Sequence, residues 1–415
     1  MLRLYHFLAQ FLTPLLKAHL KRRLKQGKED PTRLYERFGG ASLPRPKGKL
    51  IWIHAASVGE SVSVLQLIAD LRAKHPEVSI LLTTGTVTSA RLMAQRLPRE
   101  VIHQYIPLDV PRWVKRFLNH WQPQEAIFLE SELWPNILQA AKKMSIPLML
   151  LNASLSEKSY KRWRLARPIA AKIFSYFDRI LTPSLETAMR LKNLSVKTVE
   201  LTTNLKFTAT PLPVNQEELD YLKTHIARPF FTAASTHPGE EEKMIQVYLS
   251  LKQNYPDLLF ILAPRHPHRA NEILKMLAEA NLTIARRSLR EIPTINHQVW
   301  LIDTIGDLGL IYSLAPFCFL GGSMVPIGGH NAIEPFALNC LVIQGDQTFK
   351  STHINIILTP VLVTVKNPEE LVVAAEAYLQ YPHKLLPLQQ QAQAILAEQR
   401  QGLSEIIDKI MESMR

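Results

Sequence analysis

The sequence predicts an α/β fold class with two doubly wound domains, and three observations support it. At 415 residues the chain is longer than one ordinary domain. Its 47% hydrophobic and 20% charged residues are typical of a globular protein with a sizeable core. From residue 50 onward, short continuous apolar runs alternate with helix-like segments. That alternation indicates parallel strands buried on both faces by helices.

The N-terminal segment, residues 1–30, precedes this alternation and is both apolar and basic. Its apolar run from Leu4 to Leu16 is shorter than the ~20 residues that a membrane-spanning helix needs. Basic residues follow, without the small residues of a signal-peptide cleavage site. We expect a membrane-associated anchor that lies in or dips into the interface, with its basic part on anionic headgroups on the cytoplasmic side. The alternative is an amphipathic helix packed on the protein's own body.

The first α/β domain is expected over residues 31–210. Its predicted elements alternate in chain order between strands of buried apolar residues and helices of apolar periodicity. The strands are "KLIWIHAA", "VSILLTT", "VIHQYIP", "EAIFLE" and "IPLMLLN", and the helices are "ESVSVLQLIADLRAKH", residues 88–96, "VPRWVKRFLNHW" and the one opened by "SELWPN".

The second α/β domain is expected over residues 211–415, after the proline-containing stretch "KFTATPLPVNQEE" interrupts the pattern. The C-terminal stretch from "HKLLPL" onward looks helical, and it either remains on its own domain or crosses back to the first. The predicted strands are "PFFTAAS", "DLLFILAP", "LTIAR", "QVWLID", "APFCFLGG" and "CLVIQG".

Charge and cysteine content narrow the class of function. The formal net charge of +13 indicates an acidic partner, such as an anionic membrane or a phosphorylated substrate. The sequence has no zinc-finger spacing and no RNP-like aromatic run, so we do not expect a nucleic-acid partner. Cys318 and Cys340 lie in apolar stretches, which predicts reduced core residues and favours a cytoplasmic main body.

Two such domains create a cleft, and ligands bind at the carboxyl ends of parallel strands. In "IHAASVGE" a strand leads directly into Gly59 and Glu60. Glu60 can serve there as a general base that takes a proton from an attacking hydroxyl. The alternative is a helix-start glutamate stabilised by the helix dipole. Because that dipole weakens a base, catalysis would require partial burial to offset it.

Further polar clusters follow strands of the second domain. In "APRHPHR", Arg265 can donate two parallel hydrogen bonds to a phosphate or carboxylate. In "LIDTIGDLGLIY", exposed amides around Gly306 can meet a base or phosphate, although a plain helix cap at Asp303 is equally consistent. "ASTHPGEEE" can hold a phosphate on its hydroxyls and amides, but ordinary capping explains it better because Glu240 to Glu242 are negative.

The stretch "GGSMVPIGGHNAIEP", residues 321–335, combines two glycine pairs with His330, Asn331 and Glu334. Free amides at a helix start suit a phosphate, and the carboxylate of Glu334 can accept hydrogen bonds from a ribose diol. The pattern therefore predicts a nucleotide site. No GxGxxG, GxxxxGK[ST] or Asp-x-Asp motif occurs, and no residues fall at metal-ligand spacing, so we expect metal-independent chemistry without a cofactor.

In this order, the motifs resemble those of the Kdo transferases, which attach 3-deoxy-D-manno-oct-2-ulosonic acid (Kdo) to the lipid A precursor of Gram-negative bacteria. The resemblance covers almost the whole chain. It depends on "RFG" at 37–39, "WIHAASVGE", "PLDVP", "ESELWPN", "NLKF", "STHPGEEE", "APRHP", "DTIGDL" and "GGSMVPIGGHNAIEP".

The resemblance implies a GT-B glycosyltransferase fold, two Rossmann-like domains facing a cleft, with an N-terminal membrane-associated helix. It implies that Glu60 is the catalytic base, and that the chain acts at the inner membrane on the lipid A precursor (lipid IVA) with CMP-Kdo as donor. Asp307 stands where a glutamate is usual in the family. The segments matching the family's CMP-contacting positions are Pro264 and Arg265, then Ile305, Gly306 and Asp307, then Asn331, Ala332, Ile333 and Glu334.

Two alternatives remain open from the sequence. One is another GT-B enzyme, such as a heptosyltransferase or a sugar-nucleotide epimerase, which would prefer a different nucleotide. The other is a non-catalytic membrane-surface protein that binds acidic glycolipid, in which Glu60 would be only a helix-start residue.

Overall fold

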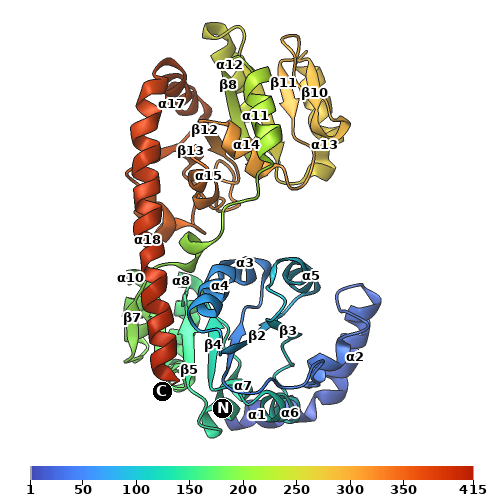
Figure 1. The fold of residues 1–415 in the computed structure, drawn as a ribbon, viewed down its shortest axis with the longest axis vertical. Helices are drawn as coiled ribbons and strands as arrows, with labels where there is room; N and C mark the ends of the chain where they lie inside the picture. Colours follow the sequence, from blue (N-terminus) through green and yellow to red (C-terminus); the bar gives the residue numbers. More distant parts are fainter. Residues whose placement is uncertain (1, 415) are drawn as a thin grey trace. The chain divides into compact units, whose positions relative to one another are not determined.

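The structure is a computed structural model that describes residues 2–414, and the chain divides into two compact units (Figure 1). The first unit contains the chain up to Thr210 together with the part from Gln399 onward. The second unit is Pro211–Glu398. Each unit has one seven-stranded sheet, and every strand pairing in both sheets is parallel. The predicted class of two parallel-sheet α/β domains is therefore confirmed.

The sheet of the first unit has the strand order β3-β2-β1-β4-β5-β6-β7. The chain leaves β1 toward β2 and β3 and then returns to place β4 on the other side of β1. The carboxyl ends of β1 and β4 therefore flank a topological switch point, where open α/β sheets bind ligands. The strands are β1 (Leu50–His54), β2 (Ser79–Thr84), β3 (Ile102–Tyr105), β4 (Glu125–Leu129), β5 (Leu148–Leu151), β6 (Arg179–Thr182) and β7 (Val199–Leu201).

Both faces of this sheet are buried, which is why its strands read as continuous apolar runs. Along β1, Trp52 packs on one face in an aromatic cluster with Phe117 and Phe128, whereas Ile51 and Ile53 point into the core on the other face. The covering helices are α3 (Val58–Ser63), α4 (Leu65–Lys74), α5 (Val87–Arg96), α6 (Pro111–Trp121), α7 (Pro135–Lys143), α8 (Glu157–Leu165), α9 (Arg167–Phe174) and α10 (Leu185–Asn193), with short 3₁₀ helices η1 (Leu34–Phe38) and η2 (Leu205–Thr208).

The sheet of the second unit has the order β10-β11-β9-β8-β12-β13-β14. Its switch point lies between β8 and β12, because the chain builds outward from β8 through β9 and then returns to the other side of β8. The loops that follow β8 and β12 are therefore neighbours at the carboxyl edge. The strands are β8 (Phe230–Thr236), β9 (Leu259–Pro264), β10 (Ile284–Arg286), β11 (Val299–Leu301), β12 (Phe317–Leu320), β13 (Leu341–Gly345) and β14 (Leu362–Val365).

Helices also cover the second sheet, and the last helix belongs to both units. Helix α18 (Leu385–Ser413) is continuous; its part from Gln399 onward belongs to the first unit, where Ile406 and Ile410 are buried beside β1 residues (Figure 1). The other helices of the second unit are α11 (Gln216–His225), α12 (Glu241–Asn254), α13 (Ala270–Glu279), α14 (Leu308–Leu314), α15 (Ile333–Ala337), α16 (Thr352–Leu358) and α17 (Pro368–Gln380), with η3 (Pro267–Arg269), η4 (Arg287–Leu289) and η5 (Pro382–Lys384).

The N-terminal segment forms two short helices, α1 (Leu2–Phe11) and α2 (Thr13–Lys25), which are separated at Leu12 before Pro14. Tyr5 donates a hydrogen bond to Asp109 (3.0 Å), and His6 hydrogen-bonds Asn136 (2.9 Å), so one face of α1 is fixed to the first unit. The opposite face exposes apolar side chains. Within residues 2–414, no helix combines the length and the apolar character needed to cross a bilayer.

Two details differ from the sequence-based expectation. The segment "ESVSVLQLIADLRAKH" forms two helices, α3 and α4, that meet at Val64 rather than one. Strands β6, β7 and β14 were not predicted, although β14 lies in the apolar run "VLVTV". They are only three or four residues long, and β7 and β14 are edge strands with partly exposed residues, so no strong burial pattern marks them.

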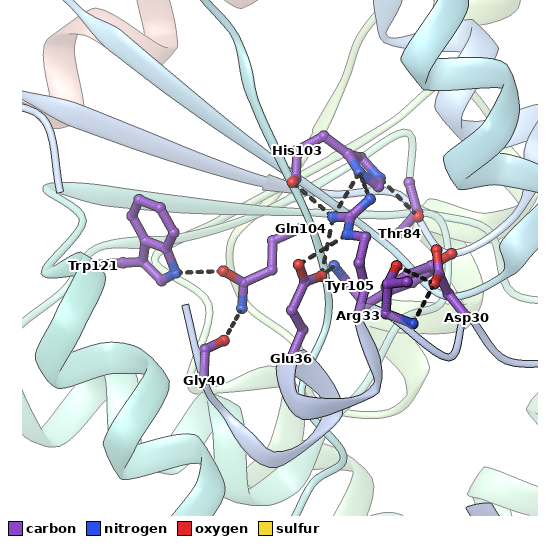
Figure 2. A network of polar contacts seen from close by, with 10 residues as sticks. Asp30, Arg33, Glu36, Gly40, Thr84, His103, Gln104, Tyr105 and Trp121 are labelled. Atoms are coloured by element: carbon purple, nitrogen blue, oxygen red, sulfur yellow. Dashed lines mark hydrogen bonds and ion pairs between the residues drawn. The ribbon is translucent and has the colours of Figure 1, made fainter. Parts of the chain in front are cut away.

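A buried polar network fastens the segment around η1 to β3 (Figure 2). Arg33 forms an ion pair with Glu36 and donates to the carbonyl of His103, whose imidazole also contacts Thr84. Glu36 in turn accepts the backbone N–H of Tyr105. The network explains how the charged side chain of Glu36, directly before "RFG", can be completely buried.

Arg37 extends this fastening toward the loop that follows β2. It pairs with Glu29 and donates to the carbonyl of Gly85 (2.6 Å). The N–H of Gly85 in turn donates to Ala56, just before Glu60. Gly39 is required at the end of η1, because its φ is +74° and a Cβ would lie 2.1 Å from the carbonyl oxygen of Trp113.

Candidate active site

Glu60 lies in the first turn of α3, directly after β1, and is only 8% exposed. Its carboxylate accepts hydrogen bonds from the N–H of Ala56 (2.9 Å) and from the hydroxyl of Ser57 (2.7 Å). Burial raises the pKa of Glu60 above its usual value, the two hydrogen bonds oppose this, and nearby Glu130 and Glu132 raise the pKa further. The burial that a base at a helix start requires is therefore present.

Glu130 and Glu132 belong to the loop that follows β4, on the other side of the switch point. Glu130 has a left-handed backbone (φ +53°) and lies 3.5 Å from the ammonium group of Lys206. Glu132 accepts a hydrogen bond from the indole of Trp134 (2.8 Å), and its Oε2 lies 3.5 Å from Nε2 of the buried His54. That separation is an ion-pair distance and is too long for a good hydrogen bond.

The acidities of these carboxylates differ because their partners differ. Burial raises the pKa of Glu132, but His54 and Trp134 outweigh burial and leave it below its usual value. The pKa of Glu60 is shifted in the opposite direction. When the environments of two neighbouring carboxylates shift their pKa values in opposite directions, one carboxylate can accept a proton while the other stays charged. Glu60 is the better base of the two.

A cavity of about 260 Å³ lies beside Glu130 in the first unit. Its lining is mixed, with apolar side chains such as Leu133, Trp163 and Phe174 and polar ones such as Ser154 and Ser159. It is larger than the 150 Å³ cavity that holds a benzene molecule in an engineered protein. A small chemical group with both polar and apolar parts therefore fits next to the carboxylate of Glu130.

In the second unit, basic side chains gather at the carboxyl edge of the sheet. Arg265 follows Pro264, the buried last residue of β9, and its side chain is exposed. The imidazoles of His237, after β8, and His330, in the loop after β12, approach each other with 2.8 Å between their Nε2 atoms. Burial lowers the pKa values of both imidazoles, and the charges of Arg265 and Lys350 lower them further. This edge suits an anion.

Glu240 joins the loops after β8 and β12, and its side chain is completely buried. Its carboxylate accepts the N–H of His237 (3.0 Å) and three N–H groups from the glycine-containing loop: those of Gly322 (2.7 Å), Ser323 (3.0 Å) and Met324 (2.9 Å). The expectation of ordinary helix capping underestimates this residue, because most of its partners come from another loop.

The segment Ile305, Gly306 and Asp307 follows β11 at the same edge of the sheet. Ile305 is 92% exposed, and Gly306 has a φ of +102° with open space around it. The carboxylate of Asp307 is occupied by Arg287 (3.0 Å) and by the hydroxyl of Thr304. Burial raises the pKa of Asp307, but these partners leave it below its usual value. Asp307 therefore shapes the loop, and the exposed backbone around Gly306 is what a ligand can reach.

Residues 331–334 begin helix α15. Asn331 accepts the N–H of Ile333 (3.1 Å) and so starts the turn, while Ala332 and Ile333 are buried. Glu334 is exposed and close enough to Tyr312 of α14 to affect its pKa. The glycines before this helix bring two loops together: a Cβ on Gly321 would lie 2.4 Å from the carbonyl oxygen of Ser235.

The structure thus brings the predicted donor-site residues to one edge of the second sheet, and Glu60 to the equivalent edge of the first. Sequence reasoning did not anticipate His54, Glu132 and Lys206 around Glu60, nor the His237–His330 contact. The sequence signals were "ESELWPN" and "NLKF" for the first group, and "STHPGEEE" and "GGSMVPIGGHNAIEP" for the two histidines. In residues 2–414, no group of three His, Cys, Asp or Glu side chains is arranged to hold a metal ion.

Comparisons with known proteins agree with this geometry. Residues 32–209 match the family described as 3-deoxy-D-manno-octulosonic-acid transferase (kdotransferase). A 3-deoxy-D-manno-octulosonic acid transferase of Rickettsia bellii is 36% identical over 374 residues, 89% of each chain. A probable mitochondrial 3-deoxy-D-manno-octulosonic acid transferase of Arabidopsis thaliana is 37% identical over 361 residues, 85% of this chain and 81% of the relative. A Rickettsia africae glycosyltransferase superposes with a TM-score of 0.61 at 12% identity, covering 89% of this chain and 98% of the other, so the fold is GT-B-like.

Proposed function

Because the chain belongs to the Kdo transferase family of enzymes, we propose that it moves Kdo from CMP-Kdo to the 6′-hydroxyl of tetra-acylated lipid A precursor (lipid IVA). The proposed reaction is a direct, inverting and metal-independent glycosyl transfer. The observation that supports it best is the buried Glu60 with a raised pKa at the switch point of the first sheet.

In this reaction Glu60 removes the proton from the acceptor hydroxyl. The oxygen of that hydroxyl attacks the anomeric carbon of Kdo at the same time. The new C–O bond forms as the bond to the phosphate of CMP breaks, and CMP leaves with the electron pair. A base works best when its pKa approaches the working pH, which the burial of Glu60 favours. Glu130 lies close to the base and is paired with Lys206, and these two side chains can orient the acceptor sugar.

The donor is assigned to the second unit. Arg265 is suited to the phosphate of CMP because its exposed guanidinium can donate two parallel hydrogen bonds. The exposed backbone around Gly306 is suited to the cytosine, and Glu334 to the ribose hydroxyls. Pro264, Ile305, Asp307, Asn331, Ala332 and Ile333 complete the proposed CMP site as its framework.

The acceptor is assigned to the first unit. The cavity beside Glu130 offers space for part of the acceptor, and α8 next to it is basic, with Lys158, Arg162 and Arg164. Helix α8 has no buried residues, so these charges are accessible to the phosphates of a lipid headgroup.

We also propose that the N-terminal helices hold the protein on the cytoplasmic face of the inner membrane. Helix α1 exposes Leu4, Phe7, Leu8 and Phe11, with Phe7 64% and Phe11 70% exposed. Basic residues dominate the following helix, including Arg22, Arg23 and Lys25 in its last turn. An apolar face beside a basic stretch is the pattern of interfacial binding to anionic lipid.

The direct test is mass spectrometry of the lipid after purified protein is incubated with CMP-Kdo and lipid IVA in detergent. We expect a product heavier by one or more Kdo units, together with free CMP, in the presence of a metal chelator. An unmodified lipid, or CMP release without a modified lipid, would contradict the proposal. The product mass also counts the sugars that are transferred.

A further inference from the structure

We propose that His237 and His330 form a proton-sharing pair that takes up a proton when an anionic nucleotide binds, so that donor binding is linked to pH. The inference rests on the proposed donor site and extends it. The contact that supports it is the 2.8 Å separation between the two Nε2 atoms. Two nitrogens at this distance need one proton between them, because two protonated or two unprotonated nitrogens would repel.

The pair is held in place by the backbone around it. The N–H of His237 donates to the buried Glu240, and Gly322, whose N–H donates to the same carboxylate, lies against both rings. A Cβ on Gly322 would lie 3.2 Å from Nε2 of His330 and 3.4 Å from Cδ2 of His237. The rings are nearly parallel, with an interplanar angle of 14°. The contact is therefore a fixed feature of the two loops.

Cationic and titratable groups face the pair from two segments of the chain. Arg265, His266 and Arg269 approach from the end of β9 and η3, and Lys350 from the loop after β13. Arg269 is neutralised by Glu241 (2.8 Å) and Glu272 (2.7 Å). Among the described residues, no carboxylate forms an ion pair with Arg265 or Lys350, and the carboxylate of Glu240 is already occupied by backbone N–H groups.

Burial, reinforced by this surplus of positive charge, opposes the binding of an extra proton to the pair. Burial lowers the pKa of His330 to about 4, helped by His237, Arg265 and Lys350. Burial and the same cations lower the pKa of His237 as well. At neutral pH the pair is therefore uncharged, with one imidazole N–H donating to the other ring.

A phosphate or carboxylate that enters beside Arg265 and Lys350 offsets the local excess of positive charge around the pair. It attracts positive charge, so it raises the affinity of the pair for one proton beyond the single N–H that each neutral ring carries. That proton comes from solvent and makes one ring an imidazolium, which still donates to its neighbour. By linkage, the nucleotide must bind more tightly as pH falls, by up to about tenfold per pH unit for one proton.

Calorimetric titration with CMP tests the linkage. Measured at pH 6.5 in buffers of different ionisation enthalpy, the binding enthalpy gives the number of protons exchanged. The phosphate of CMP itself titrates near pH 6, so the quantity that matters is the difference between wild type and His330→Gln. We expect wild type to take up about half a proton more than the variant. His237→Gln should behave like His330→Gln, and provides a second variant if one of them fails to fold.

His268→Gln is the matched control, because His268 is an exposed histidine that packs against His266 and not against the pair. It should keep the proton uptake of wild type. CMP binding with equal proton exchange in wild type, His330→Gln and His237→Gln would overturn the inference and leave the donor assignment intact. Absence of CMP binding to wild type between pH 6 and 8 would contradict the donor assignment and the linkage together.

Discussion

Three carboxylates lie close to the switch point of the first sheet, and their different partners give them different roles. Glu60 is buried and accepts hydrogen bonds from Ala56 and Ser57. Burial outweighs these hydrogen bonds, so the pKa of Glu60 is raised. Glu132 faces His54 and Trp134 and keeps a lowered pKa, while Glu130 faces Lys206. At the scale of single residues, the proposed base is therefore distinguished by its surroundings and not by its residue type.

Replacing Glu60 with Gln should lower turnover by about 10²–10⁴-fold, because the amide preserves size but cannot accept the proton. The affinity for CMP should be unchanged. CMP release with both substrates and calorimetry with CMP measure the two quantities. Because its pKa is raised, wild-type turnover should fall as pH drops through a value above the ordinary glutamate pKa of about 4.3.

The control for this variant is Glu77→Gln, whose side chain is 64% exposed on the loop before β2. It should retain wild-type turnover. Near-normal turnover of Glu60→Gln would remove Glu60 from the role of base.

At the scale of elements, buried charges fix the loops that form each site. Glu240 holds the loop after β12 against the loop after β8 through four backbone N–H groups, and Arg37 connects η1 to the loop after β2. These side chains take no direct part in the proposed chemistry, yet the shape of each loop depends on them.

Glu240→Gln should destabilise the second unit by about 3 kcal/mol, because the amide has one oxygen and its NH₂ group would face backbone donors. The affinity for CMP should fall as well, since the donor loop loses its fixed shape. Thermal unfolding and calorimetry measure these effects. Glu242→Gln alters an exposed neighbour on the same helix. It should change neither the stability of the second unit nor the affinity for CMP. Equal stability of the two variants would show that the four hydrogen bonds contribute little.

The network around His103 predicts a specific acid sensitivity (Figure 2). Burial, together with Arg33, lowers the pKa of His103 to about 3, below its value in the unfolded chain. Between about pH 6.5 and 3 the unfolded state therefore binds more protons than the folded state. As pH is lowered through this window, the free energy of unfolding should fall by up to about 1.4 kcal/mol per pH unit. His103→Gln, which can still accept from Arg33, should show a shallower pH dependence in denaturant titrations. Parallel curves for the two proteins would refute this.

At the scale of the whole molecule, the net charge of +13 and the exposed face of α1 suggest how the protein would meet the proposed lipid substrate. Tyr5 and His6 fix one face of α1 to the first unit, which leaves the phenylalanine side of the helix available to a bilayer. The two expectations for the N-terminus, an interfacial anchor and a helix packed on the body, are therefore compatible.

The double variant Phe7→Ser/Phe11→Ser should bind anionic vesicles at least about tenfold more weakly. The reason is that burying one phenylalanine side chain contributes about 1.5–3 kcal/mol to the binding free energy. Its affinity for CMP should remain that of wild type. Vesicle sedimentation measures the first quantity and calorimetry the second. Ile295→Ser removes an apolar side chain that is 67% exposed in the second unit and should not affect vesicle binding. Undiminished binding of the double variant would place the membrane contact elsewhere.

The sequence by itself determined the α/β class and most strands, because burial on both sheet faces leaves continuous apolar runs such as "LIWIH" and "FILAP". It also indicated Glu60 and the glycine-rich stretch before α15, since glycines and polar residues that follow strands are local signals. Short edge strands such as β7 had no such signal.

Only the tertiary structure decided which side chains meet. His237 and His330 are 93 positions apart, and Glu240 reaches amides more than eighty positions away. The shift in the pKa of Glu60 likewise depends on burial and on Glu130 and Glu132, which follow a different strand. Burial and charge act through space, so their effect on a residue is known only when the strand order places its neighbours.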